Sequence, residues 1–468
     1  MSLRQQVLKG GAYLVVRQAL GIAIGLVGVL LLTRLIGPAN YGVYAGSMAF
    51  MLYLLSVSIT GVDVYILRRD EEPEKVLYDQ AFTWLVATSV AFAALSVGGL
   101  EIYEAMFGDA RFVLPLEVLL LVLPVNVLHY PAFTLLERAL NYQAIAVLEL
   151  SGQMLFYSVS VGLAAIGWGV WAPIVGYWVW QVWLVAAASE RARLRPRFVW
   201  SRPLLREMLR YGFGYSASQW VWQLRDLVNP VVVGRLLGAE AVGYIALAVR
   251  LVDALAFVKH ATWRLSIAAF AKVQRDYDRF RPIVEEAMAL QVLVLGPILV
   301  GATVAAMWGF TAVFGEQWSL ALDIFPFLAL GALLNAVFNM FSSVLYVAGR
   351  NRDVLVFHAA HVALFATANL VLVPWLGLIG FGIAEIVAFL AYAISHWYVR
   401  KLFRPSYRRV LPWLLAFIPG LFALTVPRPW GLILCVPALV VLLAPRQRNQ
   451  LKEYTSYFRL RLRGEGAS

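Results

Sequence analysis

The chain has 468 residues, of which 61% are hydrophobic and only 14% carry a charge. A soluble globular chain is nearer half apolar and a quarter charged, so this composition excludes a soluble domain and predicts a polytopic membrane protein. The single cysteine, Cys435, excludes an internal disulfide and a cysteine-clustered metal site.

The predicted elements begin with a long apolar run over residues 10–36, preceded by Arg4 and Lys9. A signal-peptide core spans about 7–15 residues, so this longer run is predicted to be a retained first helix. A spanning helix takes about 20 mostly apolar residues, and by that measure the chain holds about 14 spans. Their ranges are 10–36, 41–67, 78–106, 112–136, 143–166, 169–190, 208–236, 241–265, 283–308, 319–347, 353–374, 378–399, 410–426 and 430–445.

The basic residues lie mainly on one set of loops. If the loops alternate and the N-terminus is cytoplasmic, about 32 Lys and Arg fall on the inner side and about 4 on the outer side. This asymmetry predicts that both termini are cytoplasmic. It also accounts for the formal net charge of +12 without a nucleic-acid partner, because basic inner loops contact anionic lipid.

An internal repeat divides the chain. The segment RLIGPANYGVY at residues 34–44 resembles GRLLGAEAVGY at residues 234–244, and the matched pairs are Arg34 with Arg235, Gly37 with Gly238, and Gly42 with Gly243. The offset corresponds to six helices, and parallel six-helix repeats are a recurring transporter plan with the substrate site between them. The predicted organisation is an N-terminal bundle at 1–190, a cytoplasmic connecting segment at 191–207, a second bundle at 208–400, two additional helices at 410–445 and a basic cytoplasmic tail at 446–468.

Several motifs carry a resemblance to a known family. They are RLIGPANYGVY, LERALNYQAIAVLE at 136–149, GWGVWAP at 167–173, GRLLGAEAVGYIALAVRL at 234–251 and FGEQW at 314–318. Together they resemble the Wzx-type polysaccharide biosynthesis flippases of the multidrug/oligosaccharidyl-lipid/polysaccharide superfamily. The resemblance implies two six-helix bundles around a central cavity lined by helices one, two, seven and eight.

Five charged residues lie well inside the first, seventh and eighth predicted spans. Arg17 is in the first span, and the later members are Arg225, Asp226, Arg250 and Asp253. A charge at this depth costs at least about 2.5–3.5 kcal/mol, so each of these groups requires a partner or water. Arg250 and Asp253 are three residues apart and so share a helix face, on which they are candidates for pairing.

Two interpretations of these charges stay open. In the first, Arg17, Arg225 and Arg250 face a hydrated cavity and bind the pyrophosphate and sugar head group, because arginine offers a planar fork of donors. In the second, they form a structural network that joins helices. The acids that are candidates for pairing or ion coupling are Asp226, Asp253, Glu149 and Glu385.

Asp63 and the pair His358 and His361 each have a structural interpretation beside a functional one. Asp63 is close to the inner end of its span, which favours a solvated end group over a coupling site. His358 and His361 share a helix face, but two histidines without a third ligand favour polar helix packing over a metal site. No metal and no cofactor are therefore expected.

The function implied by the resemblance is transport of undecaprenyl-pyrophosphate-linked oligosaccharide across the bacterial inner membrane, for surface polysaccharide biosynthesis. The implied partners are that lipid, the membrane lipids, and a polymerase with other export machinery. The alternatives are a cation-coupled multidrug exporter of the same superfamily and a membrane glycan ligase or polymerase. An enzyme is not expected, because the sequence has no phosphate-binding G-x-x-x-x-G-K-[ST] loop, nucleophile elbow or H-E-x-x-H motif.

Overall fold

A computed structural model describes residues 3–69, 74–257 and 277–452, and the regular structure in these ranges is helical, which confirms the predicted class. Nine of the described helices are long and apolar enough to cross a membrane, or ten if the bent pair Trp430–Leu443 and Pro445–Lys452 forms one span. The predicted number of fourteen is therefore not confirmed. Parts of the predicted span 241–265 and of the predicted tail lie outside the described residues.

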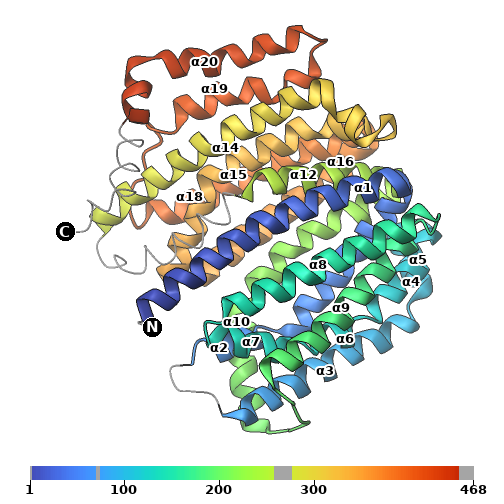
Figure 1. Ribbon diagram of the computed structural model, residues 1–468. Helices are drawn as coiled ribbons and strands as arrows, with labels where there is room; N and C mark the ends of the chain where they lie inside the picture. The colour runs from blue at the N-terminus through green and yellow to red at the C-terminus, as the bar shows by residue number, and fades with distance from the viewer. Residues whose placement is uncertain (1–2, 70–73, 258–276, 453–468) are drawn as a thin grey trace. The chain divides into compact units, whose positions relative to one another are not determined.

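Figure 1 shows the helices coloured in chain order. The helices of the first half are α1 (Leu3–Ile59), α2 (Val62–Leu67), α3 (Lys75–Val97), α4 (Leu100–Phe107), α5 (Val113–Leu120), α6 (Leu123–Val127), α7 (Tyr130–Arg138), α8 (Tyr142–Ala165) and α9 (Trp171–Ala192). Those of the second half are α10 (Arg202–Val228), the π-helix η2 (Asn229–Val233), α11 (Gly234–Leu237), α12 (Ala239–Leu255), α14 (Tyr277–Phe314), α15 (Ala321–Val347), α16 (Asn351–Leu376), α17 (Leu378–Ala388) and α18 (Tyr392–Arg400). The chain continues through α19 (Leu411–Leu421) and α20 (Val436–Leu443), and short 3-10 turns complete it at Ala110–Phe112, Glu316–Trp318, Phe389–Ala391, Ala423–Thr425 and Trp430–Cys435.

The chain forms two compact units. The first comprises Met1–Ala254, Val313–Ala321 and Leu355–Ala391, and the second comprises Leu255–Ala312, Leu322–Val354 and Tyr392–Ser468. In the first unit, α8 packs along both α1 and α9 (Figure 1). In the second, α14 approaches α19 so closely that a Cβ on Gly296 would overlap the ring of Phe417. The division into bundles at 1–190 and 208–400 stays a prediction.

The repeated glycines interrupt the helices in the same way. α1 is two helices joined at a kink at Gly37, where φ is 75° and ψ is 172°. The matching residue Gly238 separates α11 from α12 with φ 84° and ψ −180°. Glycine tolerates this conformation because it has no Cβ, so the sequence repeat at these positions encodes a break of the same geometry.

The second pair of repeated glycines brings the two repeats into direct backbone contact. A Cβ on Gly42 would overlap the carbonyl oxygen of Ala239, and a Cβ on Gly243 would overlap that of Pro38. Pro38 and Ala239 occupy matching places in the repeat, so each contact has a counterpart on the other side. Reciprocal contacts of this kind are the signature of a two-fold relation, and small residues permit such close helix approach.

The repeated arginines are exposed, and each lies beside a segment from the other half of the sequence. Arg34 donates from Nη1 to the carbonyl oxygen of Val313 at 3.2 Å, and Trp318 donates from Nε1 to that of Thr33 at 3.3 Å. On the matching side, a Cβ on Gly108 would lie 3.1 Å from the Cα of Arg235. The contacts of the two repeats at this position are therefore similar in place but not in detail, since Arg34 makes a guanidinium hydrogen bond and the backbone of Arg235 is closely approached.

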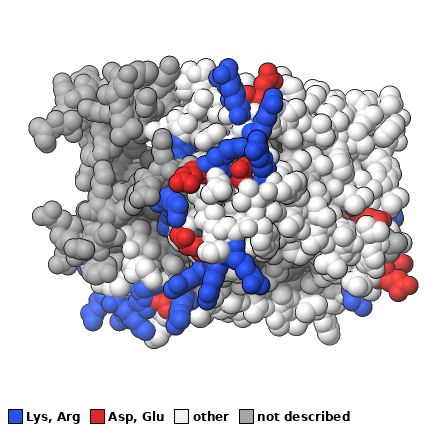
Figure 2. Space-filling view, turned by 90° about the horizontal axis from the view of Figure 1, so that it is seen from below, with Lys and Arg blue, Asp and Glu red and all other residues white. Residues whose placement is uncertain are grey.

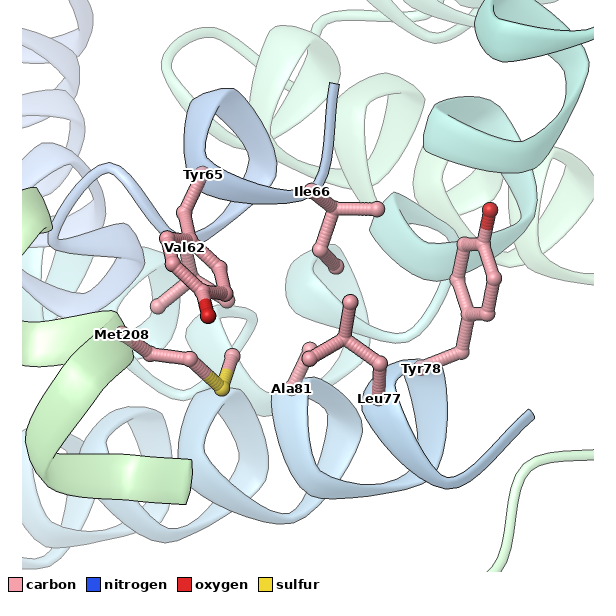
Figure 3. Close-up of a cluster of buried hydrophobic side chains, with 7 residues drawn as sticks. All are labelled: Val62, Tyr65, Ile66, Leu77, Tyr78, Ala81 and Met208. Carbon is pink, nitrogen blue, oxygen red and sulfur yellow. The ribbon is translucent and has the colours of Figure 1, made fainter. Parts of the chain in front are cut away.

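Side chains of α3 accept hydrogen bonds from the backbone of the connecting segment. Alternate backbone amides donate to them: Arg197 to Asp79 at 3.0 Å, Val199 to Thr83 at 2.9 Å and Ser201 to Gln80 at 2.5 Å. Beside this segment, apolar residues of α2, α3 and the start of α10 form one buried cluster (Figure 3). Its members are Val62, Tyr65, Ile66, Leu77, Tyr78, Ala81 and Met208. The polypeptide therefore enters the second half along a fixed path.

Lys and Arg side chains gather in groups on the face shown in Figure 2, with few acidic side chains between them. Much of the other described surface in this view is uncharged. A division into charged and uncharged surface suits a protein whose helices cross a membrane. The cytoplasmic placement of both termini stays a prediction.

Replacing Gly42 by alanine is expected to lower the free energy of unfolding by about 1–3 kcal/mol, because the added Cβ has no room and the backbones must separate. Thermal unfolding of the detergent-solubilised protein measures the loss. Gly162→Ala in α8 is the matched control, since its Cβ would meet nothing within 4 Å. Equal melting temperatures for the two variants would contradict the close contact.

Candidate substrate cavity

A cavity of about 970 Å³ lies within the first unit. Its walls come from α1, α2, α7, α8, α9, α10 and α12, with Phe365 of α16 and Phe381 of α17. This volume is at the upper end of the range for small-molecule pockets, about 300–1,000 Å³. The cavity is therefore large enough for a polar head group of several rings.

The cavity is lined by charges of both signs. The basic members are Arg225 and Arg250, and the acidic members are Asp63, Asp226 and Asp253. Four of these five are the residues of α10 and α12 that the sequence placed inside predicted spans. A hydrated cavity explains how those helices tolerate them, because the charges keep contact with water.

Arg250 lies at the meeting point of three helices. Its Nη2 lies 3.5 Å from the place where a Cβ on Gly25 of α1 would be, and the Gln153 Nε2 and Tyr157 hydroxyl of α8 lie 3.2 and 3.8 Å from the same point. The Tyr157 hydroxyl therefore lies close to the Arg250 guanidinium. Guanidinium, amide and hydroxyl donors thus converge next to a glycine, where no side chain separates them.

The convergence depends on a glycine face of α1. Gly21, Gly25 and Gly28 recur at helical spacing, and a Cβ on Gly28 would overlap the ring of Tyr157. Gln153 also donates from Nε2 to the carbonyl oxygen of Gly21 at 2.9 Å. Sequence reasoning missed Gln153 and Tyr157, although the spacing of small residues signals close helix packing.

Arg225 is held by an acid far along the chain. Its Nη2 lies 2.5 Å from Glu385 Oε2, and its guanidinium lies 5.0 Å from the ring centroid of Phe365. Glu385 is 7% exposed, whereas Arg225 reaches the cavity wall. The ion pair offsets the cost of both buried charges and fixes the direction of the guanidinium.

Arg17 is also paired, but it is not among the cavity-lining residues. It forms an ion pair with Glu149 of α8, and its side chain is 24% exposed. The partner is remote in sequence, so spacing alone did not reveal it. The structure therefore brings Arg225 and Arg250 together at one cavity and places Arg17 elsewhere.

The predicted pairing of Arg250 with Asp253 is absent from the ion pairs of the described residues. Asp226 and Asp253 are both exposed within the cavity wall. His358 and His361 pack against Trp222, with ring centroids 4.8 and 5.0 Å from its ring. These contacts join α10 to α16 and agree with polar helix packing.

Comparisons with known proteins identify relatives over most of the chain. Residues 31–323 match the model of a family described as "Polysaccharide biosynthesis protein". The lipopolysaccharide biosynthesis protein WzxC of Escherichia coli (strain K12) is 24% identical over 449 residues, which cover 93% of this chain and 89% of that protein.

Solved structures show the same fold. The lipid II flippase MurJ in an inward closed conformation superposes with a TM-score of 0.74 at 12% identity, over 92% of this chain and 96% of that one. A multidrug resistance MATE family transporter of the MOP superfamily, inward-facing, superposes with a TM-score of 0.58 at 16% identity, over 82% and 94%.

Replacing Glu385 by alanine is expected to lower the free energy of unfolding by about 3–5 kcal/mol, because Arg225 keeps its charge without its carboxylate. Replacing both residues together, as Arg225→Met with Glu385→Leu, is expected to cost less than the single change. Thermal unfolding in detergent gives both values.

The control for this pair is Arg111→Ala, which breaks a 2.8 Å pair with Asp109 in which the arginine side chain is 59% exposed. An exposed pair contributes about 0–1 kcal/mol. A double variant that unfolds at or below the temperature of Glu385→Ala would refute the structural role of the ion pair.

Proposed function

The chain belongs to the polysaccharide biosynthesis protein family, and on that premise we propose that it is a flippase for undecaprenyl-pyrophosphate-linked oligosaccharide. It moves this lipid from the cytoplasmic to the outer leaflet of the bacterial inner membrane, for assembly of surface polysaccharide. The observation that carries the proposal is the convergence of Arg250, Tyr157 and Gln153 beside a cavity of about 970 Å³.

The chemistry of this convergence suits a pyrophosphate. Arginine keeps its charge when dehydrated and donates in a fork that matches phosphate oxygens. Arg250 lies beside the Tyr157 hydroxyl, and no ion pair of the described residues includes it, so its charge is available to an anion. Tyr157 and Gln153 add neutral donors within reach of the same place.

The other two predicted arginines take different parts in the proposal. Arg225 lines the cavity in a direction fixed by Glu385, and it contributes a second, weaker attraction for the head group because its charge is largely offset. Arg17 stabilises the contact of α1 with α8 through Glu149. Arg250 is therefore the residue on which binding chiefly depends.

Transport follows from alternating access of the cavity to the two leaflets. We propose that the repeats rock about the point where Gly42 meets Gly243. The helices touch there through backbone atoms, so a small rotation does not require interlocked side chains to separate. The head group crosses inside the cavity while the polyprenyl chain stays in lipid. The shared fold with membrane transporters supports transport rather than glycan transfer by a ligase or polymerase.

One observation favours a second candidate, a cation-coupled multidrug exporter. Three carboxylates, Asp63, Asp226 and Asp253, line the same cavity, and carboxylates attract cationic compounds. The MATE likeness is compatible with this function at the level of fold. Under this alternative, loss of the protein changes susceptibility to cationic drugs and leaves surface polysaccharide intact.

Deleting the gene is expected to remove the surface polysaccharide and to leave undecaprenyl-linked glycan on the inner leaflet, because chemistry before the flip continues. Lipid extraction with leaflet-selective labelling measures the accumulation. A normal polysaccharide coat together with altered drug susceptibility would support the exporter instead.

Arg250→Gln is expected to lower export at least about tenfold while the protein level stays unchanged, because each charge-assisted hydrogen bond contributes about 1.5–3 kcal/mol. Complementation of the deletion strain measures export, and immunoblotting measures the protein level. Arg352→Gln, an exposed arginine of α16, is the matched control and is expected to export normally. Normal export by Arg250→Gln would overturn the proposed binding site.

A further inference from the structure

Three amide side chains on the cavity wall have oxygen atoms without a hydrogen-bond partner in the described part of the chain. They are Gln181 of α9, Gln223 of α10 and Asn229 of η2, with the unpartnered atoms Oε1, Oε1 and Oδ1. Buried polar atoms in proteins are nearly always hydrogen-bonded. Three exceptions on one cavity indicate that something other than the protein's own side chains completes them.

Asn229 has the best-defined orientation of the three. Its Nδ2 donates to the carbonyl oxygen of Val242 at 3.3 Å, so the amide nitrogen is used and Oδ1 is left as an acceptor. Asn229 also begins the π-helix η2, and single π turns inside α-helices are frequent at functional sites. Gln223 lies six residues before it on α10 and lines the same cavity.

Gln181 approaches the cavity from the other half of the sequence. It is only 3% exposed, and its Oε1 is unpartnered. Its neighbour on the same helix face, Tyr177, also lines the cavity and accepts a hydrogen bond from Asn126 Nδ2 at 2.7 Å. Gln181 is thus a buried acceptor beside a tyrosine whose own position is fixed.

We propose that Gln181, Gln223 and Asn229 form a carbohydrate subsite that recognises hydroxyl groups of the glycan carried by the lipid. This inference rests on the proposed flippase function and deepens it. A sugar hydroxyl both donates and accepts, so it completes an amide oxygen without bringing a charge. Aromatic side chains on the same wall, among them Tyr44 and Trp180, offer flat apolar faces to sugar rings.

The subsite differs in chemistry from the place around Arg250. Around Arg250, donors converge and favour an anion. At the subsite, three amide oxygens and the Trp180 Nε1 donor lack partners in the described part of the chain, and a hydroxyl can both donate to the first and accept from the second. A sugar hydroxyl that reaches one of these amide oxygens supplies the hydrogen bond that the described side chains do not. The two places together separate recognition of the pyrophosphate from recognition of the sugar.

The test compares two lipids on the purified full-length protein in lipid nanodiscs. One is the undecaprenyl-linked glycan extracted from cells that lack the gene, and the other is undecaprenyl pyrophosphate without sugar. Wild type is expected to bind the glycan-bearing lipid more tightly. Gln181→Met and Asn229→Leu are each expected to weaken its binding about three- to tenfold and to leave binding of the sugar-free lipid unchanged.

Retained binding of the sugar-free lipid also shows that each variant is folded. Asn369→Leu in α16 is the matched control: its Oδ1 is buried and unpartnered too, but it does not line the cavity. This variant is expected to keep the wild-type preference for the glycan.

Equal binding of both lipids by wild type would overturn the subsite, as would a variant that loses both lipids alike or neither. Failure of the flippase function is distinguishable, because wild type would then bind neither pyrophosphate lipid. A cationic drug that displaces the glycan-bearing lipid would show that drug and lipid share the cavity. If the protein still prefers the glycan-bearing lipid to the sugar-free lipid, the assignment of the amides to sugar recognition stands.

Discussion

The contact between Gly42 and Gly243 is the constraint on which the rest of the first unit depends. Two helices that approach through backbone atoms alone cannot shift without losing the contact, because no side chain is present to adjust. From this point α12 continues for two turns to Arg250, whose guanidinium reaches Gly25 on the other side of the α1 kink. The glycine breaks at Gly37 and Gly238 set the directions of both helices, and these directions carry Arg250 to the wall of the cavity.

The arginines within the predicted spans have two kinds of neighbour. Arg17 and Arg225 each face a glutamate from a distant helix, and such pairs offset the cost of desolvation and join the helices. Arg250 faces a tyrosine hydroxyl instead, so its charge is directed at the cavity. In the proposed function, the arginine that binds therefore differs from the structural arginines in the charge of its neighbour rather than in depth.

The cavity combines groups that would be unfavourable if it were dry. Aspartates, two arginines and residues whose amide oxygens have no partner in the described part of the chain all lie on its wall. Asp226 and Asp253 tolerate their positions because they are exposed on the cavity wall. A substrate that is anionic at one end and rich in hydroxyl groups at the other matches this distribution, and a lipid-linked glycan has both properties.

The sequence by itself determined the membrane class, the helical fold, the repeat with its glycines and the charged residues of α10 and α12. These follow from local properties, namely hydropathy, spacing and self-similarity, and they do not require knowledge of which helices meet. Tertiary structure alone decided that Glu385 pairs with Arg225, Glu149 with Arg17 and Tyr157 with Arg250. The partners are more than ninety residues apart or lie on different helices, and helix periodicity carries no information about contacts at that range. The predicted number of spans is not confirmed, because kinked and charge-bearing helices such as α1 and α10 are divided into spans only when their packing is known.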